Sequence, residues 1–553
     1  MRCRYLVLSC LFFLSIGLKS QQDTKDIGRF SGDLQFDGRV FVSDSAINAA
    51  GTPFFDYLKS SADSWLSLNY SRDQLSMGVR FDMFNNSPTF SGGITEANGI
   101  GIGMWYIRQK IQKLTFQAGY IYDQFGSGTT FRAYENRGLA IDNPLVGLSG
   151  KYELTDDITI KAIAGKQKDF RSFVNPERRF INTYAPFIKG INVDGFFKIS
   201  DKISTVPGAS FVNRTIDKAS MDAIADEINK QPVATRFLPK YNNYAYSIYN
   251  TLNVSDFAVY LEYAVKSEDV MRDLNNRLFQ STGQVIYGSL SYSRKGFGVN
   301  VAIKKTKNFD FRTSPLETFN NGVINFLPPQ TKQNSYRLLS RYNHNTQLLD
   351  ELGYQIDVTF KPKKSMTFNA NFSNVENEEE LLFREMYLDC QIRIPKKKWK
   401  LLVGIQAVDY NQRVYEVKPD ADYVQTLTPF AEFTWKLDRK KSIRTELQYM
   451  KTKREYDLFG KDDPKPDKEQ DLGDWLYGLV EFNVAPKYSI SVSDMYNLPA
   501  ELHYYDFSIF YTNRTNRFSL GYVKQVQGII CTGGVCRFEN AFSGVKIGLT
   551  SSF

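Results

Sequence analysis

The sequence has no long hydrophobic run after Leu18. A membrane-spanning α-helix needs about 20 consecutive apolar residues, and charged or polar residues interrupt every later apolar stretch before that length. The mean hydropathy of the 553-residue chain is −0.37. A bundle of membrane helices is therefore excluded. If the chain crosses a membrane, it must do so with β-strands.

Histidine and cysteine are scarce, with two and five residues. Zinc and haem sites need several such ligands, so we expect no metal and no cofactor. A Ser-His or His-Asp hydrolase would have to use His344 or His503. Asp506 shares a predicted strand with His503, but the two positions have opposite parity and their side chains should lie on opposite faces. We therefore predict that the protein is not an enzyme.

The chain also lacks a strong net charge. Its 69 Lys and Arg residues and 60 Asp and Glu residues leave a formal charge of +9. No cluster of Lys and Arg with interleaved aromatic residues lies on one predicted helix or loop. Such a cluster is the usual footprint of a nucleic-acid interface. We therefore expect no nucleic acid among the partners.

The N-terminus has the pattern of a secretory signal peptide, predicted over residues 1–20. Arg2 and Arg4 supply the positive start, an apolar core follows from Leu6 to Leu18, and Ser20 is a small residue before a cleavage site. The mature domain should then run from residue 21 to 553. A lipoprotein would use Cys10 instead, but few apolar residues precede it and the apolar run continues past it. The pattern favours export without lipidation.

The last strand alternates in polarity. Val545, Ile547 and Leu549 fall on one face, and Lys546 and Gly548 fall on the other. This alternation is what a strand with one lipid-facing side and one lumen-facing side requires.

The chain ends on an aromatic residue, Phe553. An exported chain that ends on an alternating strand with a terminal aromatic residue resembles a bacterial outer-membrane β-barrel. The resemblance implies that Phe553 acts as an assembly signal. It also implies that the outer-membrane lipid surrounds the barrel.

Short polar turns and longer loops alternate along the whole mature chain. The predicted turns are 72–73, 110–113, 155–157, 201–202, 255–256, 294–295, 361–364, 395–398, 437–441, 484–487 and 513–516. The predicted loops are 43–63, 85–98, 123–144, 168–184, 215–242, 267–282, 306–350, 374–383, 413–423, 453–473, 497–502 and 526–540. Within the loops, 219–230 and 333–352 have the pattern of short amphipathic helices.

This alternation predicts an all-β fold, a transmembrane antiparallel up-and-down β-barrel. Such barrels have short periplasmic turns and long extracellular loops. The count is about 24 strands, with both termini on the periplasmic side and one domain. Aromatic residues make up 14% of the chain, which fits girdles at the two membrane interfaces. A large soluble β-protein also has alternating strands, but its fold does not require short turns and long loops to alternate regularly.

A barrel of this width encloses a large lumen, and the first strand, predicted over 29–42, leaves no room for an N-terminal plug. We expect loops to narrow the lumen, chiefly residues 123–144 and also 306–350. The candidate constriction residues are Phe125, Phe131, Arg132, Tyr134, Glu135 and Arg137. The candidate lumen-lining residues are Asp357, Glu432, Arg444, Glu446, Asp506 and Lys546.

Two segments resemble a family of outer-membrane barrel proteins of unknown function found in the Bacteroidetes. One is the loop from Asp123 to Asn143, and the other runs from Gly533 to Arg537. The resemblance covers nearly the whole mature chain. It implies the fold and the outer-membrane location, and it brings no catalytic or binding residues.

Cys531 and Cys536 lie close together in the last predicted loop. In an oxidising compartment, such a pair is expected to form a disulfide. Cys390 lies within a predicted strand and should stay unpaired.

The function predicted from the sequence is a non-enzymatic channel or transport pathway whose lumen is narrowed by inward-folded loops. The alternative is a structural or accessory subunit of an outer-membrane secretion, assembly or adhesion complex. In that case, other outer-membrane or secretion-complex proteins would be the partners.

Overall fold

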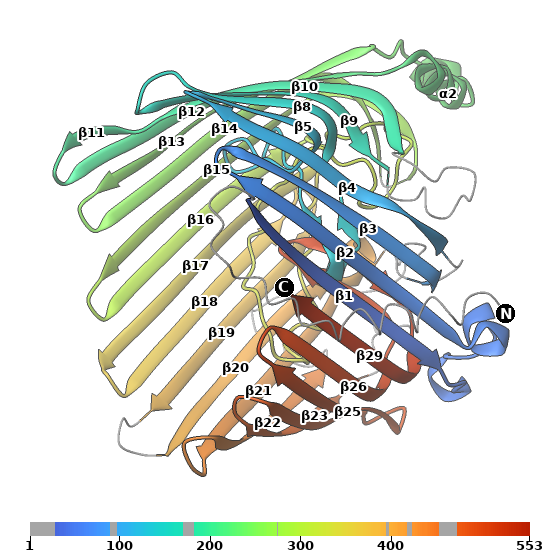
Figure 1. Ribbon diagram of the computed structural model, residues 1–553, viewed down its shortest axis with the longest axis vertical. Helices are drawn as coiled ribbons and strands as arrows, with labels where there is room; N and C mark the ends of the chain where they lie inside the picture. The colour runs from blue at the N-terminus through green and yellow to red at the C-terminus, as the bar shows by residue number, and fades with distance from the viewer. Residues whose placement is uncertain are drawn as a thin grey trace.

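The computed structural model describes residues 28–88, 97–169, 182–273, 275–393, 398–416, 423–452 and 473–553. These residues form a closed barrel of 24 antiparallel strands (Figure 1). The barrel closes where the first strand pairs with the last, in a register that places Arg39 opposite Lys546. The predicted fold class and strand number are therefore confirmed. The predicted signal peptide lies outside the described residues.

The strands follow one another around the barrel in chain order. The first are β1 (Arg29–Phe41), β2 (Ser60–Arg72), β3 (Leu75–Ser87), β4 (Ala97–Ile111), β5 (Leu114–Ile121), β8 (Leu145–Glu153), β9 (Ile158–Lys168) and β10 (Thr183–Gly195) with its extension β11 (Phe197–Ser200). The next are β12 (Ile203–Thr215), β13 (Asn242–Val254), β14 (Phe257–Arg272), β15 (Leu278–Arg294), β16 (Phe297–Lys307), β17 (Asp350–Lys363), β18 (Met366–Glu376) and β19 (Leu381–Arg393). The last are β20 (Trp399–Asn411), β21 (Tyr423–Lys436), β22 (Lys441–Thr452), β23 (Trp475–Val484), β24 (Tyr488–Asn497), β25 (Leu502–Asn513), β26 (Asn516–Gln525) and β29 (Phe542–Ser552).

Short elements occupy several loops. They are η1 (Ser45–Ile47), η2 (Phe54–Leu58), β6 (Glu135–Asn136), η3 (Arg137–Leu139), β7 (Ile141–Asp142), α2 (Lys218–Asn229), η5 (Val233–Thr235), α3 (Gln412–Tyr415), β27 (Gly528–Thr532) and β28 (Val535–Glu539). None of the described helices is long and apolar enough to cross a membrane.

The predicted turns within the described residues join neighbouring strands. For example, the turn predicted at 513–516 lies between the end of β25 and the start of β26. One loop is shorter than predicted, because β14 and β15 continue through much of 267–282 after a register shift between Lys266 and Asp269. The turn at 395–398 and the loops at 85–98, 168–184, 413–423 and 453–473 fall wholly or largely on residues outside the described ranges.

The two predicted loop helices have different outcomes. Helix α2 forms because Asp217 caps its first turn by accepting from Ser220 N at 3.1 Å, and because its apolar face is buried. It projects beyond the strand ends (Figure 1). The helix predicted over 333–352 is wrong. No helix forms there, and Leu338 N donates instead to the Gln448 side chain of the barrel wall at 2.8 Å.

The outer face of the barrel is apolar and the inner face is polar. In β25, Tyr505, Phe507 and Ile509 are exposed on the outside, while Asp506 and Ser508 face inward and bond to each other. This is the alternation expected of a strand between lipid and a polar lumen.

An aromatic belt follows the outside of the barrel near the short turns. Rings on five consecutive strands, β14 to β18, lie next to one another, with centroid distances of 4.6 to 6.5 Å. The rings are Phe257, Tyr292, Phe297, Phe360 and Phe368. Aromatic girdles of this kind mark the interface between lipid and water.

The C-terminal residue is held at the seam between β1 and β29. Phe553 N donates to Gly32 O at 3.0 Å, and Gly32 N donates to Phe553 O at 2.8 Å. The Phe553 ring covers Gly32 so closely that an added Cβ there would lie 2.6 Å from it. The ring is 61% exposed on the outside, as the strand parity predicts.

Candidate functional site

Three segments of the chain contact inward-facing side chains of the barrel wall. We call residues 122–144 the first inner loop, residues 308–349 the inner segment, and residues 528–539 the last hairpin. They touch one another: Phe326 N of the inner segment donates to Gly128 O of the first inner loop at 2.9 Å, and Thr346 N donates to Gly534 O of the last hairpin at 3.0 Å. The candidate site is the set of contacts that holds these segments inside.

The apolar part of the first inner loop is buried against the barrel wall. Phe125 and Phe131 are almost fully buried with ring centroids 5.3 Å apart, and they pack with Ile163, Ile188 and other wall residues. Full burial of such a side chain contributes about 1.5–3 kcal/mol. The turn between them needs Gly126, which has a φ of +51°.

The charged part of this loop is fastened by Arg80 of β3. Arg80 forms ion pairs with Asp82 at 2.6 Å, Asp142 at 2.8 Å and Glu135 at 2.9 Å, and its side chain is almost fully buried. Lys168 of β9 adds a second ion pair with Asp142 at 2.5 Å. Burial alone would raise the pKa of Asp142, but Lys168 and Arg80 hold it below its ordinary value. This carboxylate therefore stays charged and ties the loop to β3 and β9.

Arg137 points toward the first strands. It donates to Glu135 at 2.7 Å and to Gln35 of β1 at 2.7 Å, and its guanidinium lies 4.9 Å from the Trp65 ring centroid. The predicted constriction residues Glu135 and Arg137 thus belong to the contact between the loop and the β1–β3 wall.

Arg132 is held by aromatic rings and not by a carboxylate. Its guanidinium carbon lies 4.4 Å from the Tyr134 ring centroid and 3.9 Å from the Phe326 ring centroid. Within the described ranges, no carboxylate forms an ion pair with it. Partial burial lowers its pKa, although an arginine remains charged near neutral pH. Its guanidinium therefore lies without a direct ion pair at an open hollow that Asp123, Tyr134 and Glu135 also line.

The inner segment crosses from one part of the wall to another. Near its start, Val323 O accepts from Gln167 of β9 at 2.7 Å. Farther along, Asn334 donates to Glu385 of β19 at 2.9 Å, and Leu339 O accepts from Gln406 of β20 at 3.2 Å. The segment is therefore bound to strands on both sides of the interior.

Lys304, Glu351 and His344 form the fastening at the end of the inner segment. Glu351 pairs with Lys304 at 2.8 Å and with His344 Nε2 at 3.0 Å, and all three side chains are fully buried. Gln347 N donates to the same carboxylate at 2.6 Å. His344 is therefore engaged by a buried carboxylate and has a structural role in this fastening.

A second buried cluster fastens the beginning of the inner segment. Arg214 of β12 pairs with Asp269 of β14 at 2.6 Å and also donates to the backbone oxygen of Arg312. Lys266 pairs with the other oxygen of Asp269 at 3.3 Å and donates to Asp310 O at 2.6 Å. In this cluster, charged side chains of the barrel wall donate hydrogen bonds to backbone oxygens of the inner segment.

The predicted lumen-lining residues of β21 and β22 lie together. Arg444 pairs with Glu446 at 2.5 Å and with Glu432 at 3.1 Å, and Glu481 of β23 lies 3.7 Å away. Tyr336 of the inner segment donates to Glu432 at 3.3 Å. This patch holds more carboxylates than cations, although Lys400 also pairs with Glu432 at 3.2 Å.

The other predicted lumen-lining residues are dispersed. Asp357 accepts from Asn371 and Gln355, each at 2.8 Å, and Asp506 bonds to Ser508. Lys546 donates to Gln525 at 2.8 Å. None of the three belongs to the Arg444 patch. Their role in lining a pathway stays a prediction.

His503 lies outside the barrel. Its Nδ1 is 2.6 Å from Asp494 of the neighbouring strand, and its ring lies 4.4 Å from that of Tyr496. Its partner is thus Asp494 and not Asp506. Among the described residues, no group of three His, Cys, Asp or Glu side chains could hold a metal ion.

The last hairpin places Cys531 and Cys536 opposite each other. Gly533 and Gly534 form its turn with φ of +59° and +73°, as a type I′ turn requires. The Cys531 side chain is outside what the structure describes, so the disulfide stays a prediction. Cys390 is free.

The sequence analysis missed the wall residues that hold the inner segments, chiefly Arg80, Lys168, Arg214, Lys266 and Lys304. A usable signal was present. Each lies on an inward-facing strand position, and all except Arg80, which lies near the middle of β3, are in the half of the strand that adjoins a long loop. A charged residue there needs either water or a partner from a loop.

These features define a class: a closed β-barrel with a polar inner face that its own loops contact. Within that class, the chain belongs to a family of unknown function, DUF6029, whose model matches residues 2–553. The predicted family of unknown function is thus confirmed, while the Bacteroidetes source stays a prediction. No curated protein matches the sequence.

Several solved structures are similar in fold. The siderophore receptor PirA from Pseudomonas aeruginosa has 10% identity and a TM-score of 0.41, with 95% of this chain and 80% of that chain covered. The translocation pore of the P pilus usher PapC has 9% identity and a TM-score of 0.44, with 94% of this chain and 99% of that chain covered. OccK8 (OprE) from P. aeruginosa has 10% identity and a TM-score of 0.38, with 69% of this chain and 94% of that chain covered. These likenesses are too distant to carry an argument about function.

Proposed function

We propose that the protein is an integral outer-membrane barrel that provides a gated transport pathway, without catalysis of its own. The apolar outer face and the aromatic belt support insertion in a membrane. The signal peptide predicted over residues 1–20 supports export, and Phe553 is the proposed assembly signal. The outer-membrane location and the Bacteroidetes source are parts of this proposal.

One observation carries the proposal: polar contacts to the wall bind the inner segment across the interior, beside the apolar contacts of residues such as Phe311 and Leu338. Water can replace the hydrogen bonds of this network when the segment moves, whereas its buried ion pairs hold the segment at rest. We infer that the inner segment and the first inner loop close the lumen at rest and move when the pathway opens.

Single-channel recording in planar bilayers tests this proposal. Replacing residues 310–347 with a short Gly-Ser linker should convert rare, small openings into large and steady conductance steps. Deletion of residues 123–144 should have a smaller effect in the same direction. The control replaces residues 438–440, the short turn between β21 and β22 at the opposite end of the strands. A conductance that stays unchanged after both inner deletions, in correctly inserted protein, would contradict the pathway.

The sidedness of the barrel is tested separately. An epitope tag after Leu238, which is 88% exposed in the loop that carries α2, should be reached by antibody on intact cells. A tag in the short turn between β21 and β22, at Arg439, should be reached only after the outer membrane is opened. The reverse labelling would overturn the proposed topology.

The alternative function is an accessory subunit of an outer-membrane secretion, assembly or adhesion complex. Exposed apolar residues at the loop end favour it, namely Val233, Leu238 and Phe319. Exposed apolar side chains of this kind can contact other outer-membrane or secretion-complex proteins. If this function is correct, the linker variant stays silent in bilayers and mild detergent extracts the protein together with stoichiometric partners.

A further inference from the structure

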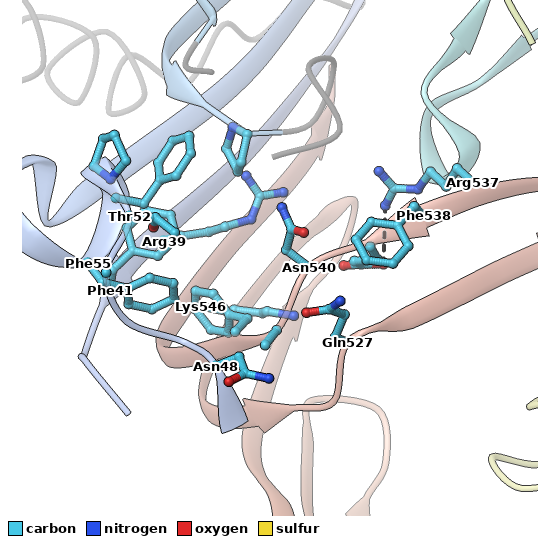
Figure 2. A pocket seen from close by; sticks show the side chains of 17 residues that line it. Arg39, Phe41, Asn48, Thr52, Phe55, Gln527, Arg537, Phe538, Asn540 and Lys546 are labelled. Carbon is cyan, nitrogen blue, oxygen red and sulfur yellow. Dashed lines mark hydrogen bonds and ion pairs between the residues drawn. The ribbon is translucent and has the colours of Figure 1, made fainter. Parts of the chain in front are cut away.

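A cavity of about 390 Å³ lies beside the seam between β1 and β29 (Figure 2). Its walls come from both ends of the chain: the loop between β1 and β2 on one side, and the last hairpin with the start of β29 on the other. This volume is within the range of small-molecule sites. The position is distinct from the fastenings of the inner segment described above.

The charges that line this cavity are mainly positive. Arg537 is neutralised by Glu539 at 3.3 Å, and Arg39 is paired with Asp63 at 3.0 Å. Lys546 differs from both. Its ammonium donates to the neutral Gln525 at 2.8 Å and lies 4.9 Å from the Phe542 ring centroid, and no carboxylate of the described ranges forms an ion pair with it.

The cavity wall that contains Phe41 is apolar and aromatic. Its ring lies 5.3 Å from that of Phe55, 5.5 Å from that of Phe54 and 5.6 Å from that of Phe542. Across the cavity, Phe538 of the last hairpin is 46% exposed. The cavity therefore combines an aromatic wall with one cation that has no ion-pair partner among the described residues.

We propose that this cavity binds a small organic anion with an aromatic or otherwise apolar body, such as an aromatic carboxylate. The anionic group pairs with Lys546, and the amide of Gln527, which points into the same space, donates to it (Figure 2). The apolar body lies against the phenylalanine wall and Phe538. Inorganic anions would leave that wall uncovered, so the chemistry of the site favours an amphiphilic ligand.

Calorimetric titration of the full-length protein in nanodiscs tests this proposal. The probes are 2-naphthoate and its neutral analogue 2-naphthamide. We expect the acid to bind at least about tenfold more tightly than the amide, because only the acid pairs with Lys546. Lys546→Gln should remove this preference, and Lys546→Arg should keep it.

A second variant protects the test against misfolding of the first. Gln527 lies in an exposed loop beside Lys546, so Gln527→Glu should fold and should weaken naphthoate binding about tenfold by occupying the cation. Gln527→Ala is its matched control, and Lys161→Gln, distant on β9, is the control for loss of an inner-face lysine. Equal binding of acid and amide, or unaffected naphthoate binding in Gln527→Glu, would overturn the proposal. The binding measurement needs no conductance, so its result is independent of the proposed pathway.

Discussion

Two parts of the barrel wall use inward-facing charges in different ways. We call the inner face of β12 to β17 the sealed sector, and the inner face of β20 to β23 the open sector. In the sealed sector, the paired side chains of Arg214 and Asp269, and of Lys304 and Glu351, are at most 1% exposed. In the open sector, Arg444 is 31% exposed and Lys400 is 34% exposed, although both are paired.

The difference indicates which part of the wall a solute would meet. In the sealed sector, the inner segment covers the charges and excludes water, so these pairs act as fastenings. In the open sector, the paired charged side chains remain in contact with the lumen and can attract or repel ions. If the inner segment moves, a pathway should form along the open sector first, because charged side chains of this sector are already in contact with the lumen.

The largest expected effect follows from breaking a fastening of the sealed sector. Glu351→Gln leaves Lys304 buried without its counter-charge, which costs about 3–5 kcal/mol in comparable buried pairs. The inner segment should therefore leave the wall more often. Limited proteolysis should show new cleavage within residues 308–349, and bilayer recordings should show frequent openings.

The matched control for this variant is Glu378→Gln. Glu378 pairs with Lys307 at 3.2 Å on the surface, and exposed pairs contribute little to stability. Cleavage at residues 308–349 in neither variant would contradict the role of Glu351 as a fastening.

A second fastening, outside the sealed sector, should show a smaller and local effect. Arg80→Met removes the common partner of Asp82, Glu135 and Asp142, and leaves Lys168 as the remaining cation for Asp142. Hydrogen exchange should accelerate in residues 122–144 and stay unchanged in the inner segment near Glu351. Equal acceleration in both regions would show that the two fastenings are one cooperative unit.

A substitution in the open sector should change the ion selectivity of the pathway and leave its closure by the inner segment unchanged. Arg444→Gln leaves Glu432, Glu446 and Glu481 with less positive charge, so the pathway should become more cation-selective. The measurement is the reversal potential across a potassium chloride gradient, in the variant whose inner segment is replaced by a linker. Arg439→Gln, in a short turn, is the control. An unchanged reversal potential would place the pathway elsewhere.

The smallest effect is expected from the last hairpin. A disulfide between Cys531 and Cys536 closes a short ring, so it should stabilise the hairpin by at most about 2–3 kcal/mol and leave barrel stability unchanged. Alkylation of unreduced protein followed by mass spectrometry checks the bond. Both cysteines carrying the label, in protein from native membranes, would rule it out.

The strands could be predicted from the sequence because parity alone decides which side chain meets lipid. In β22, Leu447 is exposed outward and Gln448 is buried inward, as the alternation predicts. The turns were equally predictable, because a short polar segment between two alternating strands is best explained as the turn that joins them.

The interior could be predicted only in part. The loop with Phe125 and Phe131 was recognised from its composition, but its partner Arg80 lies 55 positions from Glu135 in the chain. The helix expected over 333–352 is absent because Leu338 and its neighbours bind wall side chains, which is a tertiary effect that local periodicity does not contain. Where a loop folds back on distant strands, the partners are set by the barrel and not by sequence neighbours.

One measurement tests the central claim, that the inner segment closes the lumen and must leave the wall for the pathway to open. The backbone N of Leu338, in the inner segment, donates to the side chain of Gln448, in the open sector, at 2.8 Å. Cysteines at these two positions, in a background with Cys390→Ala, Cys531→Ser and Cys536→Ser, are bridged with a short bis-maleimide. Conductance is recorded in the Glu351→Gln protein before and after bridging. The account predicts that bridging abolishes the frequent openings. Openings that continue unchanged in fully bridged protein would contradict it.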